Sequence, residues 1–516
     1  MKYRFIALNS QYVHSNLALR TFHLLAGEQG INSSLQEFSI NEPLISVYAS
    51  VGEASYYFFS VYLWNREYTI KLISDLKKRY PEARFILGGP EASYKPQEFL
   101  DSGTHLIFLG EGEALFMGDK SIEEWIAEGP VVQGTIKAEH LNTTYPMTFD
   151  DERILYYEST RGCPMHCAYC VSEQDNEIRY RSMDLIKEDL RYFVEKKVPL
   201  IKFVDRTFNV NDKHALSILR FHQSLEHNHT VLHLEIEPHF LTDSFLDFLE
   251  ECDHSLIQVE VGFQAQSRQV LSAVNRVGYR PVDLERLERL MRMKGMHRHI
   301  DMIIGLPEMD MAEVRNTFNY LFSLEPSDLQ MGFLKVLPQT SLHRHPKLKS
   351  RDYPPYEIIE TAWLSAEELV FLKRVERVAG LFNRELLPFS LEVVLKDYET
   401  PFDFYVNLAE ALDHFDPMGL EGRFHFLNHA TKEKFSDYFD VDYARLKKKM
   451  LFTQHSSLSY KRLPESLKET LPKDAKHLSF FKTPFNANQE RTDRWYIMMV
   501  DHQHQHVKFT GVPYHE

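Results

Sequence analysis

The sequence predicts an α/β protein with three parts in chain order: a doubly wound, mostly parallel sheet, a second run of strand–helix units, and a mainly helical C-terminal region. Short apolar runs alternate with amphipathic helical patterns over the first two-thirds of the chain, which is typical of parallel sheets covered by helices. The chain has 516 residues, and this length favours about three domains. We place the domains at 1–140, 151–345 and 356–516.

Composition limits the classes of partner and compartment that we expect. The net charge of −15 argues against bulk nucleic acid and favours a small-molecule or peptide substrate. The most apolar long window, 44–64, contains Glu53 and fails as a membrane span. The N-terminus shows no signal-peptide pattern. Three of the four cysteines are clustered, which indicates a reducing, cytoplasmic environment, and we expect the fourth, Cys252, to be a small buried apolar residue.

The first region has the strand–helix order of a doubly wound sheet. Residues 131–151 have mixed polarity and are predicted to form a linker with a short strand at 131–136. Strands are predicted at 3–8, 33–38, 54–62, 83–87 and 105–109, and helices at 15–28 and 68–80.

Three strand ends in this region carry unusual residues. Asn9-Ser10-Gln11-Tyr12 follows the first strand, and two later strands end in Gly88-Gly89-Pro90-Glu91 and Gly110-Glu111-Gly112-Glu113. Ligands bind beyond the carboxyl ends of strands in such sheets, and glycine lets a ligand approach the backbone closely. Ordinary turn formation would also explain the glycines.

The central region opens with a cysteine-rich loop between a predicted strand, 154–160, and a predicted helix, 183–195. Cys163, Cys167 and Cys170 have the spacing CxxxCxxC. Three thiolates on one short loop can hold three corners of a cubane iron–sulfur cluster, which leaves one iron open for chemistry. The alternatives are a disulfide, or a zinc site in which His166 supplies the fourth ligand.

This spacing, with Tyr169 just before the third cysteine, resembles that of the radical S-adenosylmethionine (SAM) enzymes. The resemblance implies that SAM chelates the open iron of a four-iron four-sulfur cluster and is cleaved to a 5′-deoxyadenosyl radical. It also implies a partial (β/α)6 barrel with its active site at the carboxyl ends of the strands. The matching strands are 154–160, 200–204, 232–236, 256–261, 299–304 and 329–336, and the later helices are 213–226, 244–251, 282–294 and 311–324.

The same resemblance assigns SAM contacts at the strand ends. Asp205 would accept from the amino group, Arg276 would pair with the carboxylate, and Glu260 and Gln264 would bind ribose hydroxyls. Each acidic residue could instead form a structural ion pair or a helix cap. The full set of expected SAM contacts is Tyr169, Asp205, Glu237, Glu260, Gln264, Arg276 and Ile303, and Glu235 also flanks the third strand end.

The first region resembles the cobalamin-binding domain that precedes many radical SAM barrels. The Asp-x-His-x-x-Gly motif is absent and His14 does not match it, so we expect no protein histidine on cobalt. Residues 1–150 contain no cysteine, unlike the corresponding domain of transfer-RNA methylthiotransferases. The expected cobalamin contacts are Asn9, Tyr12, Ser60, Trp64, Gly88, Gly89, Pro90, Glu91, Gly110, Glu111, Gly112 and Glu113.

The resemblance implies a cobalamin-dependent radical SAM enzyme, with methylation of an unactivated carbon as the leading hypothesis. The family reductant is a flavodoxin or a ferredoxin. Two alternatives stay open: a cobalamin-linked rearrangement, cyclisation or oxidation without methyl transfer, and a non-catalytic cobalamin or redox sensor.

The C-terminal region carries few signals of function. Residues 345–355 are predicted to be a linker, and Ser365-Ala366-Glu367-Glu368 is a capping box that opens a helix. His502, His504 and His506 are expected on one face of a strand, where a metal site or a plain polar surface would explain them. Residues 507–509 are predicted to belong to a terminal strand.

Overall fold

The structure is a computed structural model that describes residues 2–136, 141, 153–412, 417–447, 449–453, 457–471 and 477–514. The chain divides into two compact units. The first comprises Met1–Thr317, Leu324–Pro326 and Met331–Ala366, and the second comprises Phe318–Ser323, Ser327–Gln330 and Glu367–Glu516. Among the described helices, none has the length and apolarity required to cross a bilayer.

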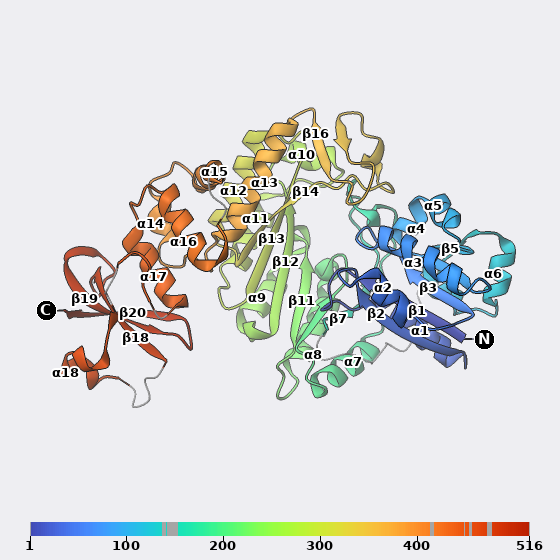
Figure 1. The fold of residues 1–516 in the computed structure, drawn as a ribbon, viewed down its shortest axis with the longest axis horizontal. Coiled ribbons are helices and arrows are strands. Elements are labelled where there is room, and N and C mark those ends of the chain that lie inside the picture. The colour runs from blue at the N-terminus through green and yellow to red at the C-terminus, as the bar shows by residue number, and fades with distance from the viewer. Residues whose placement is uncertain are drawn as a thin grey trace. The chain divides into compact units, whose positions relative to one another are not determined.

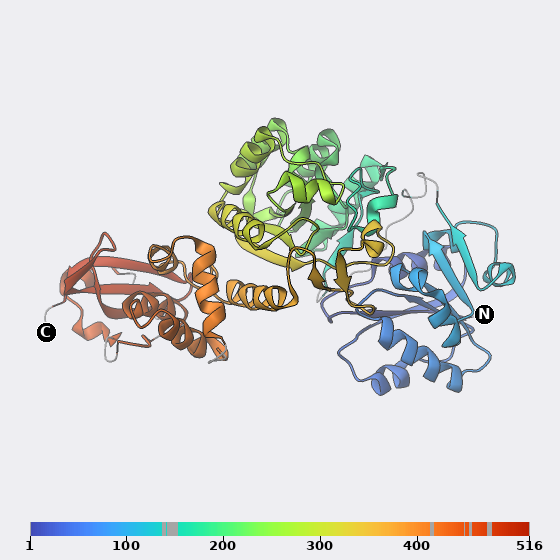
Figure 2. The same ribbon diagram turned by 90° about the horizontal axis from the view of Figure 1, so that it is seen from above.

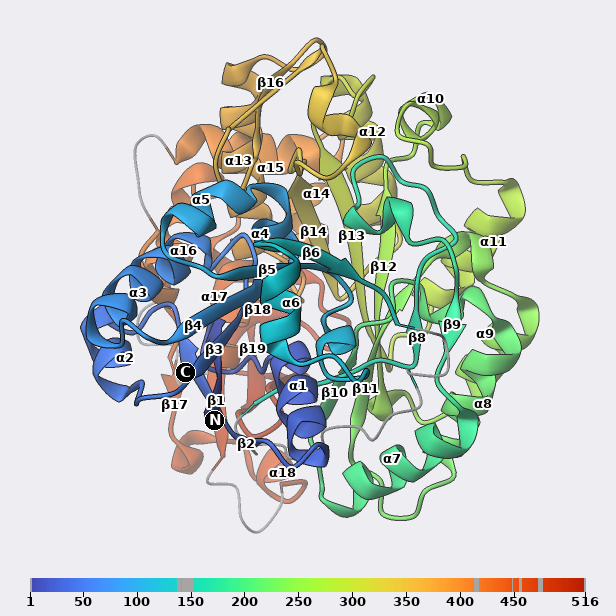
Figure 3. The same cartoon turned by 90° about the vertical axis from the view of Figure 1, so that its right-hand side faces the viewer.

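The N-terminal part of the first unit is a parallel six-stranded sheet, as predicted. Its strand order is β2-β1-β3-β4-β5-β6, with helices on both faces (Figure 1). In Figure 3, α2 and α3 lie on one side of this sheet, and α1 and α6 lie on the other. The strands are β1 (Lys2–Asn9), β2 (Asn32–Ser39), β3 (Tyr56–Ser60), β4 (Arg84–Gly88), β5 (Leu106–Gly110) and β6 (Val131–Gly134). The helices are α1 (Leu17–Glu28), α2 (Leu44–Ser50), α3 (Arg66–Arg79), α4 (Pro90–Tyr94), α5 (Pro96–Asp101) and α6 (Ile122–Glu128).

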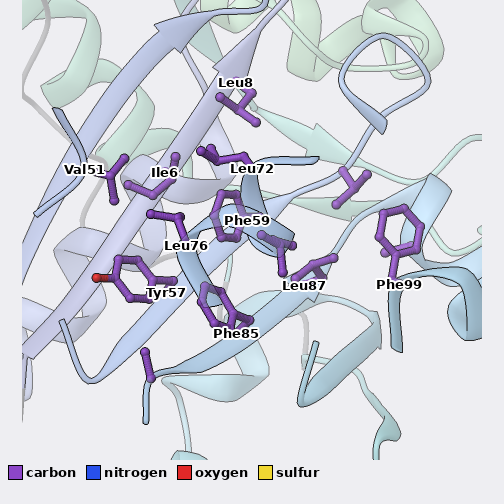
Figure 4. Packing of buried hydrophobic residues seen from close by; sticks show 14 of the residues in the cluster. Ile6, Leu8, Val51, Tyr57, Phe59, Leu72, Leu76, Phe85, Leu87 and Phe99 are labelled. Carbon is purple, nitrogen blue, oxygen red and sulfur yellow. The ribbon is translucent and has the colours of Figure 1, made fainter. Parts of the chain in front are cut away.

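The centre of this sheet is buried on both faces. Tyr57 and Phe59 of β3 pack with Ile6 and Leu72 on the α3 side (Figure 4), whereas Phe58 packs into a second cluster on the α1 side. All five residues of β3 are buried, which explains a nearly continuous apolar run in the sequence. Polar groups therefore concentrate at the strand ends. The linker predicted after β6 falls largely outside the described residues.

The middle of the chain forms the predicted six-stranded partial barrel. Its strand order is β14-β13-β12-β11-β10-β7, and the pairings from β7 to β13 are parallel. In Figures 2 and 3 the helices that follow these strands form an arc along one face of the sheet. The strands are β7 (Leu155–Tyr157), β10 (Leu200–Phe203), β11 (Val231–Ile236), β12 (Ile257–Gln264), β13 (His297–Ile304) and β14 (Asp328–Phe333). The helices are α7 (Met183–Glu195), α8 (Asp212–Gln223), α9 (Asp243–Glu251), α10 (Arg268–Ala273), α11 (Pro281–Met291) and α12 (Met311–Ser323).

Burial alternates strictly along β11, β12 and β13. The buried residues of these strands are mostly large and apolar, as residues covered by helices should be. The alternate residues face the inner side of the barrel and are mostly polar. They include His233, Glu235, Gln258, Glu260, His299 and Asp301.

Two expectations for the C-terminal third were wrong. The linker predicted at 345–355 contains β15 (Leu348–Ser350), which pairs with β16 (Ile358–Thr361). The three histidines do not share a strand face, because His502 and His504 lie in the turn after Asp501, and only His506 begins a strand. Asp501 holds this turn by accepting from the Gln503 N–H at 2.9 Å.

The second unit has the predicted helices, followed by a terminal antiparallel sheet. The sheet order is β17-β18-β19-β20, and Val441, Phe481 and Met498 join helix and sheet in one apolar cluster. The helices are α13 (Ala366–Leu381), α14 (Leu391–Leu395), α15 (Pro401–Ala411), α16 (Gly419–Ala430), α17 (Ser436–Leu446) and α18 (Glu465–Lys468). The strands are β17 (Ser457–Leu458), β18 (Leu478–Phe485), β19 (Arg491–Asp501) and β20 (His506–Pro513).

Candidate functional site

A cavity of about 870 Å³ in the first unit is lined by the carboxyl ends of the N-terminal sheet, the cysteine loop and the barrel strands. Its wall includes eight of the residues that the sequence assigned to cobalamin: Ser60, Gly88, Gly89, Pro90, Gly110, Glu111, Gly112 and Glu113. The described lining contains no histidine. From the cysteine loop and the barrel, the lining takes charged or polar residues that include Tyr156, Glu158, Arg161, Lys202, Arg206 and Glu235. The cavity therefore joins two parts of the chain that lie far apart in the sequence.

Three of the assigned cobalamin contacts lie outside the described lining of the cavity. The Asn9 amide donates to the His14 carbonyl at 2.8 Å. Trp64 stacks on Tyr62, with ring centroids 4.5 Å apart. The exposed ring of Tyr12 lies outside the described lining. Contacts from these side chains to cobalamin stay predictions.

Glu91 is a fourth assigned contact that lies outside the lining. Its buried carboxylate accepts from the Tyr356 hydroxyl at 2.7 Å and lies 3.5 Å from Arg66 Nε. Burial raises the pKa of Glu91, although Tyr356 and Arg66 oppose this shift. The observed role of Glu91 is to tie α4 to the segment between β15 and β16.

Two glycines are required at the turns that reach the cavity. Gly89 has φ 98°, and a Cβ there would lie 2.6 Å from the Val61 carbonyl oxygen. Gly110 has φ 86°, and a Cβ there would lie 2.3 Å from the Gly134 carbonyl oxygen. Larger side chains are excluded by the chain itself, so part of the glycine pattern is explained without a ligand. The same turns nonetheless present bare backbone to the cavity.

The three clustered cysteines are free thiols on one loop. Cys163 and Cys167 are buried, and Cys170 is half-buried. The Ser172 N–H donates to Cys170 Sγ at 3.4 Å, and Arg276 Nη1 donates to Cys167 Sγ at 3.6 Å. Burial raises the pKa of the Cys167 thiol, whereas Arg276 opposes this shift and favours the thiolate that iron requires. Three thiols on one loop, two of them with N–H donors at their sulfur atoms, suit an iron–sulfur cluster.

Arg276 is the centre of a buried polar network beside this loop. Its guanidinium forms an ion pair with Glu237 at 2.5 Å and donates to the Gly262 carbonyl. It also donates to the Tyr169 hydroxyl at 3.3 Å. The structure therefore brings Tyr169, Glu237 and Arg276 together next to Cys167. Their assignment to SAM stays a prediction, because Arg276 already has a carboxylate partner within the protein.

Asp205 lies at the end of β10 and has no solvent exposure. It accepts from the Ser159 N–H at 2.7 Å and from the Ser159 hydroxyl. Burial raises the pKa of Asp205 to about 6. This arrangement fits the alternative of a structural carboxylate, and the contact to the SAM amino group stays a prediction.

A second charged cluster lies on the inner side of the barrel. Glu260 Oε2 lies 2.8 Å from His233 Nε2 and 3.2 Å from Lys202 Nζ, and His233 lowers the pKa of Glu260 to about 2. Ligand atoms of Glu260, His299 and Asp301 lie within 4.8 Å of one another. These residues come from adjacent strands, so only the fold brings them together.

The remaining predicted contacts and Glu235 lie on the same strands. Gln264 has φ 73° at a register shift between β12 and β13, and Ile303 is half-buried. Glu235 faces the cavity, and the described residues offer its carboxylate no hydrogen bond or ion pair. Burial and the nearby Glu260 raise the pKa of Glu235 to about 7.

The sequence analysis missed Arg161 and Arg179. Arg161 Nη1 donates to Glu111 at 2.9 Å, and Arg161 Nη2 donates to Glu113 at 2.8 Å. Arg179 Nη1 donates to Glu111 at 2.8 Å. The only signal for Arg161 is its position two residues before the first clustered cysteine. Nothing in the sequence pairs it with a turn about fifty residues earlier.

Family comparisons identify the two parts that meet at the cavity. Residues 3–118 match a B12 binding domain, and residues 157–321 match the radical SAM superfamily. The chain therefore contains a B12-binding domain followed by a radical SAM domain. Its cofactors are a four-iron four-sulfur cluster, SAM and cobalamin. Residues 346–501 match a family described as a protein of unknown function, DUF4080.

This radical SAM protein has distant relatives. It is 22% identical over 334 residues to the cobalamin-dependent radical SAM methyltransferase TokK of Streptomyces tokunonensis, covering 56% of this chain and 48% of TokK. The chain thus spans about half the length of that curated relative.

Two solved structures share its fold. The methyltransferase TsrM of Kitasatospora setae superposes with a TM-score of 0.56 at 15% identity, covering 70% of this chain and 79% of TsrM. The cobalamin-dependent radical enzyme OxsB superposes with a TM-score of 0.57 at 13% identity, covering 86% of this chain and 79% of OxsB.

Proposed function

We propose that this protein is a cobalamin-dependent radical SAM methyltransferase that acts on an unactivated carbon of a small molecule or a peptide. The observation that carries the proposal is one continuous cavity shared by the glycine turns of the B12-binding domain, the cysteine loop and the barrel strands. Methyl transfer is further supported by the distant likeness to TokK.

The residues of the chain can be assigned to the three cofactors. Cys163, Cys167 and Cys170 would ligate three irons, and Tyr169 and Arg276, which lie beside Cys167, would contact SAM. The turns at 88–90 and 110–113 would hold cobalamin. When bound, the cluster and SAM would supply the reductive chemistry that activates a C–H bond of the substrate, and cobalamin would supply methyl-transfer chemistry.

The part played by the protein is binding, orientation and exclusion of water. The ion pair between Arg276 and Glu237 fixes a positive charge beside Cys167 in a buried site, where electrostatic interactions are strong. The polar inner face of the barrel, with Lys202, Glu235 and Glu260, suits a substrate that carries hydrogen-bonding or charged groups. A flavodoxin or a ferredoxin is the reductant that we propose.

The test is anaerobic reconstitution with iron, sulfide and hydroxocobalamin, followed by assay with SAM labelled in its methyl group. We expect about four irons and one cobalt per chain, and SAM cleavage that needs a reductant. Label in the product mass supports methyl transfer, and an unlabelled product of changed mass supports rearrangement, cyclisation or oxidation. Cofactor binding without SAM cleavage supports a sensor. A Cys163→Ala protein that kept full iron and full SAM cleavage would contradict the cluster assignment.

A further inference from the structure

Arg161 connects the cysteine loop to the Gly110-Glu111-Gly112-Glu113 turn of the B12-binding domain. Its Nη1 donates to Glu111 at 2.9 Å and its Nη2 donates to Glu113 at 2.8 Å. Its Nε and Nη2 also donate to Glu158, at 2.9 and 2.7 Å. One guanidinium therefore joins three carboxylates, and all four side chains line the cavity.

This network is shielded from solvent. The side-chain exposure of Arg161 is 19%, and that of its three carboxylate partners is 15–21%. Burial alone would raise the pKa of Glu111, but the Ile136 N–H and Arg161 outweigh burial and lower it. Removing Arg161 would leave three carboxylates close together, which is a costly arrangement in a partly buried site.

The network is rigidly linked to the first cysteine. Gly162 has φ 96°, and a Cβ there would lie 2.2 Å from the Glu177 carbonyl oxygen. The Cys163 N–H donates to the Asp175 carbonyl at 2.8 Å. Arg179, from the same segment, donates to Glu111 at 2.8 Å. A shift of the Glu111 turn would therefore be passed to Cys163 by two arginines and a short, sterically fixed piece of chain.

We propose that Arg161 and Arg179 are positioning residues that couple the cobalamin site to the cluster site. A ligand on the Glu111 turn and a cluster on Cys163 favour the same arrangement of this network, so each should strengthen the binding of the other. Such coupling is reciprocal by thermodynamic necessity. The inference rests on the cofactors of the proposed function and is independent of methyl transfer.

The experiment measures the hydroxocobalamin dissociation constant of the full chain by visible absorption, with the cluster reconstituted and again after iron chelation. For the wild-type protein we expect cobalamin to bind about 5- to 20-fold more tightly when the cluster is present, a typical coupling. In Arg161→Gln the ratio of the two constants should fall to within about twofold of unity. Arg161→Lys should give an intermediate ratio, because an ammonium keeps the charge but has three donors and lacks the planar fork that makes the four hydrogen bonds of Arg161.

The control is Arg20→Gln. Arg20 pairs with Glu37 at 2.7 Å inside the B12-binding domain, and neither side chain lines the cavity. This variant loses a comparable ion pair but should keep the wild-type ratio.

If Arg161→Gln fails to fold, Glu113→Gln is the second variant, because it removes one partner and keeps the other two. The coupling would be overturned if the ratio of the two cobalamin dissociation constants were near unity in the wild-type protein. It would also be overturned if the variant that folds, Arg161→Gln or Glu113→Gln, kept the wild-type ratio. An unlabelled product in the methyl-transfer assay would overturn the proposed function and leave this ratio intact. A wild-type protein that binds no cobalamin would overturn both.

Discussion

Asp205 accepts a hydrogen bond from the Ser159 N–H at 2.7 Å in a site with no solvent exposure. This bond joins the end of β10 to the strand that leads into the cysteine loop. Burial raises the pKa of Asp205 from 3.8 to about 6, so the folded state holds a proton that the unfolded state releases between these values. The contribution of Asp205 to folding stability therefore decreases as pH rises from about 4 to about 6.

Asp205→Asn should remove this pH dependence. Between about pH 4 and about pH 6, the change in the free energy of unfolding should differ between the two proteins by roughly 2–3 kcal/mol, since one pKa unit is about 1.4 kcal/mol. The measurement is anaerobic denaturant unfolding of both proteins between pH 4 and pH 7. The variant should also be less stable at pH 4, because the Asn side chain would place an NH₂ group opposite one of the two Ser159 donors. An unchanged slope in the variant would show that Asp205 does not titrate in this range.

Arg276→Gln should weaken SAM binding and lower iron content together. The substitution leaves the Glu237 carboxylate without its guanidinium partner in a buried site, at a cost of several kcal/mol. We expect at least a tenfold loss of SAM affinity, measured by equilibrium dialysis on the reconstituted protein.

The control for Arg276 is Arg280→Gln. Arg280 is 59% exposed and pairs with Asp283 at 2.6 Å. The Asp283 carboxylate of this pair is fully buried, so the variant should lose folding stability, but SAM affinity should be nearly unchanged because the pair includes neither Arg276 nor Glu237. Equal losses in the two variants would mean that Arg276 has no special role beside the cysteine loop.

The sequence predicted both sheets because their strands bury one or both faces and are separated by amphipathic helices. It missed α2, α4, α5 and α6, which have only five to seven residues and give no periodic pattern. The interactions of the site were harder to predict. Glu260 was assigned to the end of β12, but its contacts with His233 and Lys202 depend on the register of neighbouring strands.

The C-terminal histidines show that a sequence pattern can also predict a strand where the chain forms a turn. The pattern His-x-His-x-His suits a strand, but Asp501 accepts from the Gln503 N–H and pairs with His504 at 2.9 Å, which stabilises a hairpin turn. Local turn interactions outweighed the alternation that the sequence pattern suggested.

Gly89→Ala should destabilise the fold and reduce cobalamin retention. A Cβ at this position would lie 2.6 Å from the Val61 carbonyl oxygen, and φ 98° is strained for any L-residue. We expect a loss of about 1–3 kcal/mol in folding stability. Thermal unfolding measures this loss, and cobalt analysis measures how much cobalamin the variant retains.

Gly27→Ala is the matched control for Gly89, because Gly27 lies in α1 and a Cβ there would have no other atom within 4 Å. Replacing a helical glycine by alanine should stabilise the protein by about 0.5–1 kcal/mol. If Gly89→Ala behaved like this control, the close approach to Val61 would not constrain the turn.

Removing the charge of Glu235 and removing that of Glu260 should change the folding stability in opposite directions, although the two residues lie on adjacent strands. Burial and Glu260 raise the pKa of Glu235 from 4.5 to about 7, so its contribution to stability decreases as pH rises from about 4.5 to about 7. His233 and Lys202 lower the pKa of Glu260 to about 2, so its contribution is present above about pH 4.5 and is lost as pH falls towards 2. At pH 8, Glu235→Gln should therefore stabilise the protein, whereas Glu260→Gln should destabilise it, each by about 1–3 kcal/mol.

The measurement is thermal unfolding of the reconstituted proteins at pH 5 and pH 8. Glu235→Gln should show its largest gain at pH 8 and little gain at pH 5, where the wild-type carboxyl is already protonated. If the Glu235 carboxylate binds substrate in the cavity, Glu235→Gln should form less product than the wild-type protein, although it is more stable and keeps its iron and cobalt. Loss of stability at pH 8 in Glu235→Gln would show that this carboxylate has a partner in the folded protein.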